Sequence, residues 1–162
     1  MSYDLEFNRA LAAGPTYAQK FLLWPRQWKS YRSATRLTWH KIRYTPSRLR
    51  LLPQTTGVYA FTICPGVGDT PDFSYLVYIG KAEDQTLRQR CGQYRYEPRK
   101  PKPRPLIVKM LRLWGRHLHL YFASVPTNVG AVEDALLAAF MPPFNTDLPG
   151  KLAAIGKVIY HT

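Results

Sequence analysis

Runs of hydrophobic residues separated by turn-forming stretches predict three strands in the middle of the chain. Residues 57–63 and 75–80 are rich in β-branched and aromatic side chains, which favour strands. Residues 64–74 between them contain two prolines, two glycines and two aspartates, a composition typical of a turn. A third strand is expected over residues 117–125.

Helices are predicted on both sides of the third strand in the sequence. Helices are expected over residues 84–94, with Asp84 as the N-terminal cap, over 106–114, and over 129–141, where two prolines stop the last one. Residues 95–105 hold four prolines and five basic residues and are expected to form a basic surface loop. The order ββααβα predicts an α+β fold, a small three-stranded antiparallel sheet flanked by helices.

The predicted elements divide the chain into three parts. Residues 53–148 form the domain, residues 1–52 a basic N-terminal extension, and residues 149–162 a C-terminal tail. The extension is a candidate surface for a protein partner. No apolar run approaches the length of a membrane helix, and Asp4 and Glu6 stand where a secretory signal carries positive charge. These features predict a cytoplasmic protein without a membrane partner.

Charge adds the first functional clue. Lys and Arg number 23 against 10 acids, giving a net charge of +13, which favours a polyanionic partner. The basic residues cluster, with eight over residues 26–50 and five over residues 95–104. Nucleic acid is the expected partner, and DNA is preferred over RNA as the expectation although the clustering of charge does not by itself distinguish the two. The candidate nucleic-acid-binding residues are Arg36, Lys41, Arg43, Arg88, Arg95, Arg99, Lys100, Lys102 and Arg104.

Five features in order resemble the GIY-YIG nuclease family. They are Gly57-Val58-Tyr59, Tyr78-Ile79-Gly80-Lys81, an Arg-bearing helix, Glu133, and Pro142 followed by Phe144-Asn145. The resemblance covers about residues 55–147. It implies a metal-dependent endonuclease that hydrolyses phosphodiester bonds and leaves 5′-phosphate and 3′-hydroxyl ends. The candidate catalytic residues are Tyr59, Tyr78, Lys81, Arg90, Tyr94, Glu133 and Asn145.

Glu133 is the candidate metal ligand. On a helix it falls within the apolar stripe of Val129, Val132, Leu136, Leu137 and Phe140, where a carboxylate is costly unless a cation meets it. A single carboxylate suits Mg²⁺ or Mn²⁺, which keep several waters and accept substrate oxygens. The alternative is a first-turn glutamate stabilised by the helix dipole.

Two arginines compete for one role on the helix over residues 84–94. Helical phase places Arg90 near the inward stripe, with Tyr94 one turn along, and places Arg88 on the other side. An ungapped count from Gly80 selects Arg88, whereas phase and the family's Leu-x-x-Arg pattern select Arg90. The alternative is that Arg88 and Arg90 are both solvent-exposed charges on the helix surface and have no catalytic role.

The remaining residues have both catalytic and structural interpretations. The family's tyrosines position or activate the attacking water, and Lys81 is a cation that would favour a phenolate at Tyr59. Core packing is the ordinary role of Tyr59 and Tyr78. Asn145 would orient a catalytic group or tie down the loop after the last helix. Two other functions stay open: a nucleic-acid-binding module without catalysis, and a basic subunit of a larger nucleic-acid-processing assembly.

Overall fold

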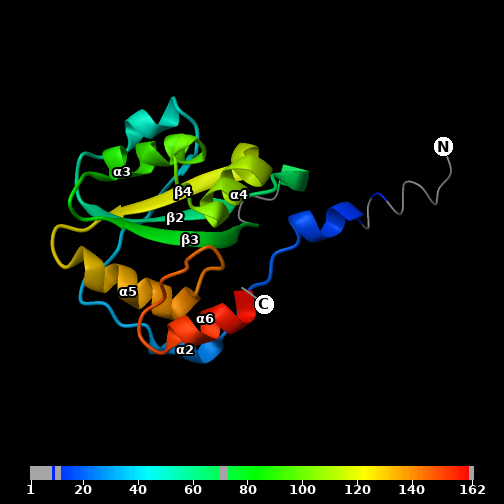
Figure 1. Cartoon of the computed structure of the whole chain (residues 1–162). Coiled ribbons are helices and arrows are strands. Elements are labelled where there is room, and N and C mark those ends of the chain that lie inside the picture. Colours follow the sequence, from blue (N-terminus) through cyan, green and yellow to red (C-terminus); the bar gives the residue numbers. More distant parts are fainter. Residues whose placement is uncertain (1–8, 10–11, 70–72, 161–162) are drawn as a thin grey trace.

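The centre of the molecule is a four-stranded antiparallel β-sheet (Figure 1). The computed structural model describes residues 9, 12–69 and 73–160. The strands, in order across the sheet, are β1 (His40–Arg43), β4 (Leu118–Ser124), β2 (Gly57–Ile63) and β3 (Tyr75–Ala82). The fold is α+β, as the sequence predicted, with β1 and β3 at the two edges of the sheet.

β1 is the strand that the sequence did not predict. Its residues are exposed except for Ile42, which packs against the core. An edge strand has a neighbour on one side only, so β1 forms with little apolar sequence. The predicted count of three strands was therefore one short, because part of the N-terminal extension pairs with β4.

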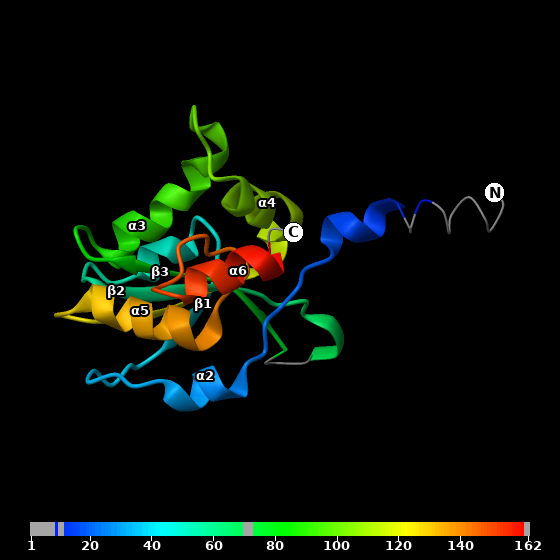
Figure 2. The ribbon, with the colours of Figure 1, turned by 60° about the horizontal axis from the view of Figure 1, so that its bottom comes forward.

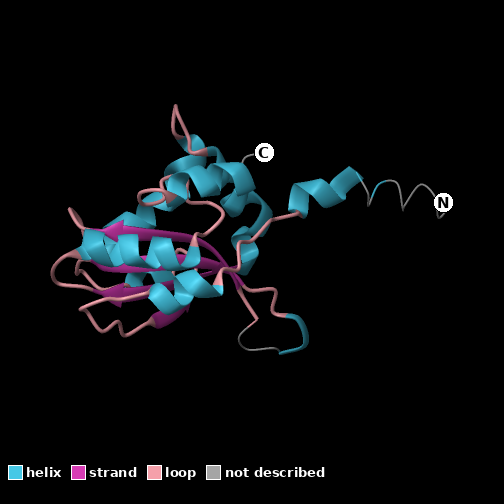
Figure 3. Cartoon of the chain, turned by 90° about the horizontal axis from the view of Figure 1, so that it is seen from below, coloured by secondary structure: helices cyan, strands magenta, loops and turns pink. Residues whose placement is uncertain are grey.

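Helices cover both faces of the sheet (Figures 1 and 3). One face carries the 3₁₀ helix η1 (Arg48–Leu51), α3 (Leu87–Gln93), the 3₁₀ helix η3 (Tyr94–Arg99) and α4 (Pro105–Trp114); the other carries α2 (Pro25–Ser30), α5 (Val129–Phe140) and α6 (Leu152–Tyr160). Within residues 9, 12–69 and 73–160, no helix is long and apolar enough to cross a membrane.

β2 supplies side chains to both halves of the core. All seven of its residues are buried. Tyr59 and Phe61 pack toward α3 and α4, while Val58 and Ala60 pack toward α5. This alternation follows from the two-residue period of a strand.

Two boundaries on the α3 side differ from the sequence prediction. Thr86, not Asp84, is the N-cap of α3, because its side chain and that of Gln89 satisfy each other's backbone N–H groups. Tyr94–Arg99 forms the 3₁₀ helix η3, which contains Pro98, although a loop was expected from residue 95 onward. More of the basic segment over residues 95–105 is therefore helical and packed against the core than the sequence predicted.

The two ends of the domain are joined through α6, which lies in the C-terminal tail, where the sequence predicted no helix. The Tyr160 hydroxyl donates to the carbonyl of Met141 at 2.7 Å and accepts from the N–H of Leu22 at 3.1 Å. α6 therefore connects the end of α5 to the N-terminal extension, and α2 lies beside α5 (Figure 2).

Candidate functional site

The hydroxyl groups of three tyrosines meet on the α3 side of the sheet. Tyr59 on β2 and Tyr94 at the start of η3 lie 2.7 Å apart at their hydroxyl oxygens. The Tyr94 hydroxyl donates to that of Tyr78 on β3 at 3.1 Å. The Nε of Arg90 on α3 donates to the Tyr59 hydroxyl at 3.3 Å. The sequence named these four residues as candidates, and the fold brings them into one hydrogen-bonded chain.

This chain has a direction. A hydroxyl has one hydrogen to donate, and Tyr94 gives its hydrogen to Tyr78. The hydrogen between Tyr59 and Tyr94 must then come from Tyr59, whose oxygen already accepts from Arg90. Tyr78 is the last member, so its own hydroxyl hydrogen is left to point away from Tyr94. Tyr78 also lines a cavity, whereas Tyr59 and Tyr94 are fully buried.

The structure does not support a phenolate at Tyr59. Burial raises the pKa of Tyr59 well above its ordinary value, and Arg90 only partly offsets this. Lys81 was expected to be the activating cation, but Tyr59 pairs with Gly80, which places the next residue on the opposite face of the sheet. A Cβ atom at Gly80 would lie 2.5 Å from the Tyr59 hydroxyl, so this glycine makes room for the tyrosine.

Arg88 and Arg90 lie in different surroundings, as helical phase predicted. The Nε of Arg88 donates to the carbonyl of Leu52 at 2.8 Å, beside η1 and away from the tyrosines. Arg90 is half-buried, and its guanidinium carbon lies 5.7 Å from the centre of the Tyr94 ring.

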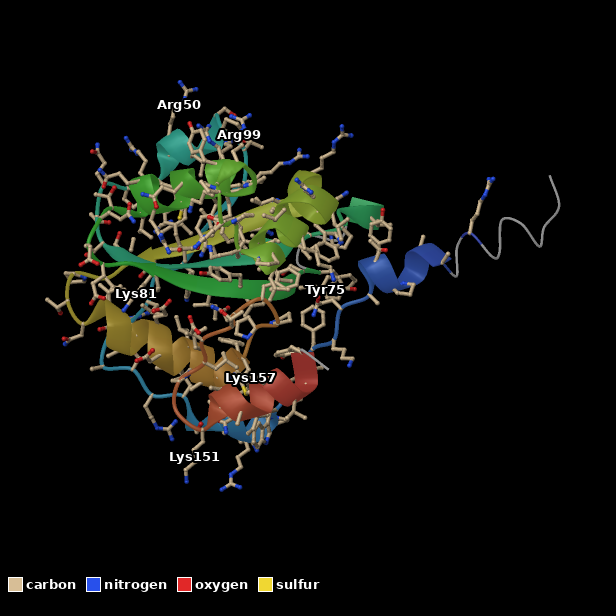
Figure 4. All side chains as sticks on the ribbon, in the orientation of Figure 1. Arg50, Tyr75, Lys81, Arg99, Lys151 and Lys157 are labelled. Atoms are coloured by element: carbon tan, nitrogen blue, oxygen red, sulfur yellow. The ribbon has the colours of Figure 1, made fainter. Side chains whose placement is uncertain are left out.

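Glu133 on α5 faces the same edge of the sheet from the other side. Its side chain is 16% exposed, and its nearest cation is the Nζ of Lys81 at 3.8 Å. Lys81 lies closer to Glu83, at 2.9 Å, and Figure 4 shows it at the end of β3 beside α5. Burial raises the pKa of the Glu133 carboxyl, and the charge of Lys81 only partly offsets that effect.

The predicted stripe of α5 is correct at four of its five positions. Val129, Val132, Leu136 and Leu137 are buried, whereas Phe140 is 45% exposed. Phe140 instead lines a surface cavity with Trp28 of α2. Glu133 is therefore a carboxylate set at the margin of an apolar helix face.

Asn145 holds the loop after α5 against the edge of β3. Its side-chain oxygen accepts from the N–H of Ile79 at 2.9 Å, and its amide donates to the carbonyl of the same residue at 2.7 Å. The N–H of Phe144 donates to the carbonyl of Val77 at 2.9 Å. Of its two expected roles, Asn145 performs the structural one and fixes the wall of a cavity.

This cavity, of about 470 Å³, brings together residues from four parts of the fold. Tyr78 comes from β3, Arg104 from the residue before α4, Glu133 from α5, and Asn145 from the loop that follows α5. Asp134 and Asp147 also line it.

The charges around the cavity suit a bound cation. Three carboxylates line it, and Arg104 is the one basic residue among its described lining residues. Glu133 accepts no hydrogen bond from the part of the chain that the structure describes, so its carboxylate oxygens are open to a cation or to water although most of the side chain is buried. Across the described residues, no group of three or more His, Cys, Asp or Glu forms a metal cluster. A Mg²⁺ held by one carboxylate and substrate oxygens fits this donor set.

Glu97 is the residue of this region that the sequence analysis missed. It is 1% exposed, and Lys100 and Arg104 both bind it through side-chain hydrogen bonds. These bonds, chiefly those from Arg104, lower the pKa of the Glu97 carboxyl to about 2. A lone acid within a strongly basic segment was the available signal.

Apart from Arg88, the predicted basic residues separate into three groups. Arg95, Arg99, Lys100, Lys102 and Arg104 follow α3, and Figure 4 shows Arg99 on the outer side of that helical layer. Lys41 and Arg43 lie on β1, at the sheet edge opposite β3, where they line a separate cavity with His119. Arg36 is exposed near α5. Only the group after α3 adjoins the cavity of Glu133.

No protein-family model, no curated protein and no solved structure matches this chain. The hydrogen-bonded chain from Arg90 to Tyr78, and the cavity that Tyr78 and Glu133 line, are therefore the basis for a functional proposal.

Proposed function

We propose that the protein is a metal-dependent endonuclease of the GIY-YIG type that hydrolyses phosphodiester bonds in nucleic acid. One observation carries the proposal. A hydrogen-bonded chain from Arg90 through Tyr59 and Tyr94 ends at Tyr78, and Tyr78 shares a cavity with Glu133. A chain of this kind placed beside a partly desolvated carboxylate is a suitable arrangement for binding a phosphate together with a divalent cation.

The order of elements also supports this proposal. β2, β3, α3, α4, β4 and α5 follow one another in the order ββααβα, with Tyr59 on β2, Tyr78 on β3, Arg90 on α3 and Glu133 on α5. DNA is the proposed substrate, because the homing endonucleases and repair nucleases of the family act on it. The net charge of +13 provides the non-specific affinity that such a substrate needs.

Each residue has a role that follows from its position. Tyr78 donates a hydrogen bond to a phosphate oxygen, because its hydroxyl hydrogen is directed away from Tyr94. Arg90 holds Tyr59 in place and contributes positive charge near the developing charge on phosphorus. Glu133 holds Mg²⁺ or Mn²⁺, and the bound ion supplies Lewis-acid polarisation of the phosphate.

The proposal is tested by cleavage assays on matched DNA and RNA with Mg²⁺ and with a chelator. We expect Mg²⁺-dependent cleavage of DNA, and a loss of about 100-fold or more in turnover for Arg90→Ala. Arg88→Ala, on the same helix but hydrogen-bonded to Leu52, should keep most of the turnover. A folded wild-type protein that binds DNA but never cleaves it would instead be a binding module or the subunit of a larger assembly.

A further inference from the structure

Glu97 is an acid buried in the most basic part of the chain. Both of its carboxylate oxygens are hydrogen-bonded. Oε1 accepts from the backbone N–H and the Nε of Arg104, both at 3.0 Å. Oε2 accepts from Nη2 of Arg104 at 3.0 Å and from Nζ of Lys100 at 2.7 Å. Burying a carboxylate is costly, and these four bonds are what make the position tolerable.

These bonds fix the orientation of Arg104. Two of them form a bidentate pair, which holds the planar guanidinium in one plane. The guanidinium carbon lies 5.0 Å from the centre of the Tyr94 ring, the same ring that Arg90 approaches. Partial burial lowers the pKa of Arg104, but the bonds to Glu97 outweigh it and the net pKa is raised.

Arg104 differs from Arg99 and Lys102 of the same segment in its burial and in its place beside the cavity. Arg99 and Lys102 are exposed, and neither lines the cavity. Arg104 reaches the cavity that contains Tyr78 and Glu133. A phosphate there would face three carboxylates, so a fixed positive charge at this point has a direct electrostatic effect on its binding.

We propose that Arg104 is a second phosphate-binding arginine of this site and that Glu97 is its positioning residue. The inference rests on the proposed function and extends it. The phosphodiester group is bound between the two arginines that lie against the Tyr94 ring. These are Arg90 on α3 and Arg104, which lines the cavity. Lys102 and Arg99 contribute only long-range attraction for the nucleic-acid backbone.

Steady-state cleavage kinetics separate these roles. Arg104→Gln should lower kcat about 100-fold at saturating DNA, since a charge contact in the transition state is lost. Arg104→Lys keeps the charge but not the bidentate geometry, and it should restore only part of the rate. Arg112→Gln, the same change at an exposed position of α4, is the matched control and should behave as wild type.

Glu97→Gln tests the positioning role. It should lower kcat about tenfold in protein that is folded at the assay temperature, since the amide keeps one acceptor oxygen and Arg104 therefore keeps its charge but loses the bidentate pairing that fixes its plane. Thermal melts run in parallel distinguish this from instability. If Glu97→Gln does not fold, the two Arg104 variants decide the proposal after their own thermal melts, because the Arg104 side chain is 41% exposed and Glu97 keeps its bonds to Lys100 and to the backbone N–H of residue 104.

Binding decides the matter if the wild type cleaves nothing. Affinity for a labelled DNA oligonucleotide is measured with and without Mg²⁺ for the same variants. Arg104→Gln should remove most of the Mg²⁺-dependent gain in affinity, whereas Lys102→Gln should reduce the salt slope by about one and leave that gain intact. Equal behaviour of Arg104→Gln and Lys102→Gln in both assays would show that Arg104 only anchors the loop, and would overturn the proposal.

Discussion

Replacing Glu133 with Gln distinguishes a metal ligand from a structural carboxylate. The change removes the charge and keeps nearly the same volume. The ion pair lost with Lys81 spans 3.8 Å, and the Lys81 side chain is 39% exposed. Such a partly exposed pair contributes about 0–1 kcal/mol to stability.

Desolvation acts in the opposite direction. Because burial raises the folded-state pKa of Glu133, ionised Glu133 destabilises the fold at neutral pH, and this cost shrinks as the pH falls from the folded-state pKa to the lower unfolded-state pKa. Glu133→Gln should therefore melt within about 3 °C of wild type at pH 7, or higher, since 1 kcal/mol corresponds to about 2–4 °C at this size. A buried, fully paired carboxylate would instead cost about 3–5 kcal/mol when removed.

The assay combines thermal melts at pH 7 and pH 5 with cleavage in Mg²⁺. Glu133→Gln should lose cleavage by about 100-fold or more while it still binds DNA without metal. Glu83→Gln is the matched control, because Glu83 also pairs with Lys81 but lies outside the cavity. Full Mg²⁺-dependent cleavage by folded Glu133→Gln protein would refute the assignment, and a loss of about 3–5 kcal/mol in unfolding free energy would make Glu133 structural.

Three further predictions concern the surrounding structure. Asn145→Ala removes two hydrogen bonds to the buried backbone of β3 and should lower the free energy of unfolding by about 2–4 kcal/mol in urea titrations. Gly80→Ala places a methyl group 2.5 Å from the Tyr59 hydroxyl, so it should reduce both melting temperature and turnover; a variant with wild-type values for both would contradict the packing. Lys41→Ala combined with Arg43→Ala should flatten the salt dependence of DNA binding by about two without lowering kcat, as measured by fluorescence anisotropy and saturation kinetics.

Local patterns in the sequence were sufficient for most elements of the domain. All three predicted strands are present with small changes at their ends, near residues 57–63, 75–80 and 117–125. The three predicted helices that follow or separate them are present as well. These segments are recognisable because apolar residues recur with a period of two or 3.6 within each of them. Helical phase also predicted, from the sequence alone, that Arg90 and Arg88 would face different surroundings.

Pairing between strands decided what local patterns left open. β1 is too short and polar to be recognised until β4, more than 70 residues later, provides its partner. The alignment of Tyr59 with Gly80 sets Lys81 on the α5 face, beside Glu133 and away from the tyrosines. The sequence already contained this information. Tyr78 and Lys81 are three residues apart on one strand, and an odd spacing places two side chains on opposite faces of a sheet.

Burial decided the rest of the candidate site. In sequence, Glu97 is one acid among prolines and basic residues, a composition typical of a solvated loop. Only the packing of η3 against the core removes it from water and makes Lys100 and Arg104 its partners. A sequence pattern specifies which face of an element is apolar, whereas the cost of burying a charge, and so the identity of its partners, depends on which elements meet in three dimensions.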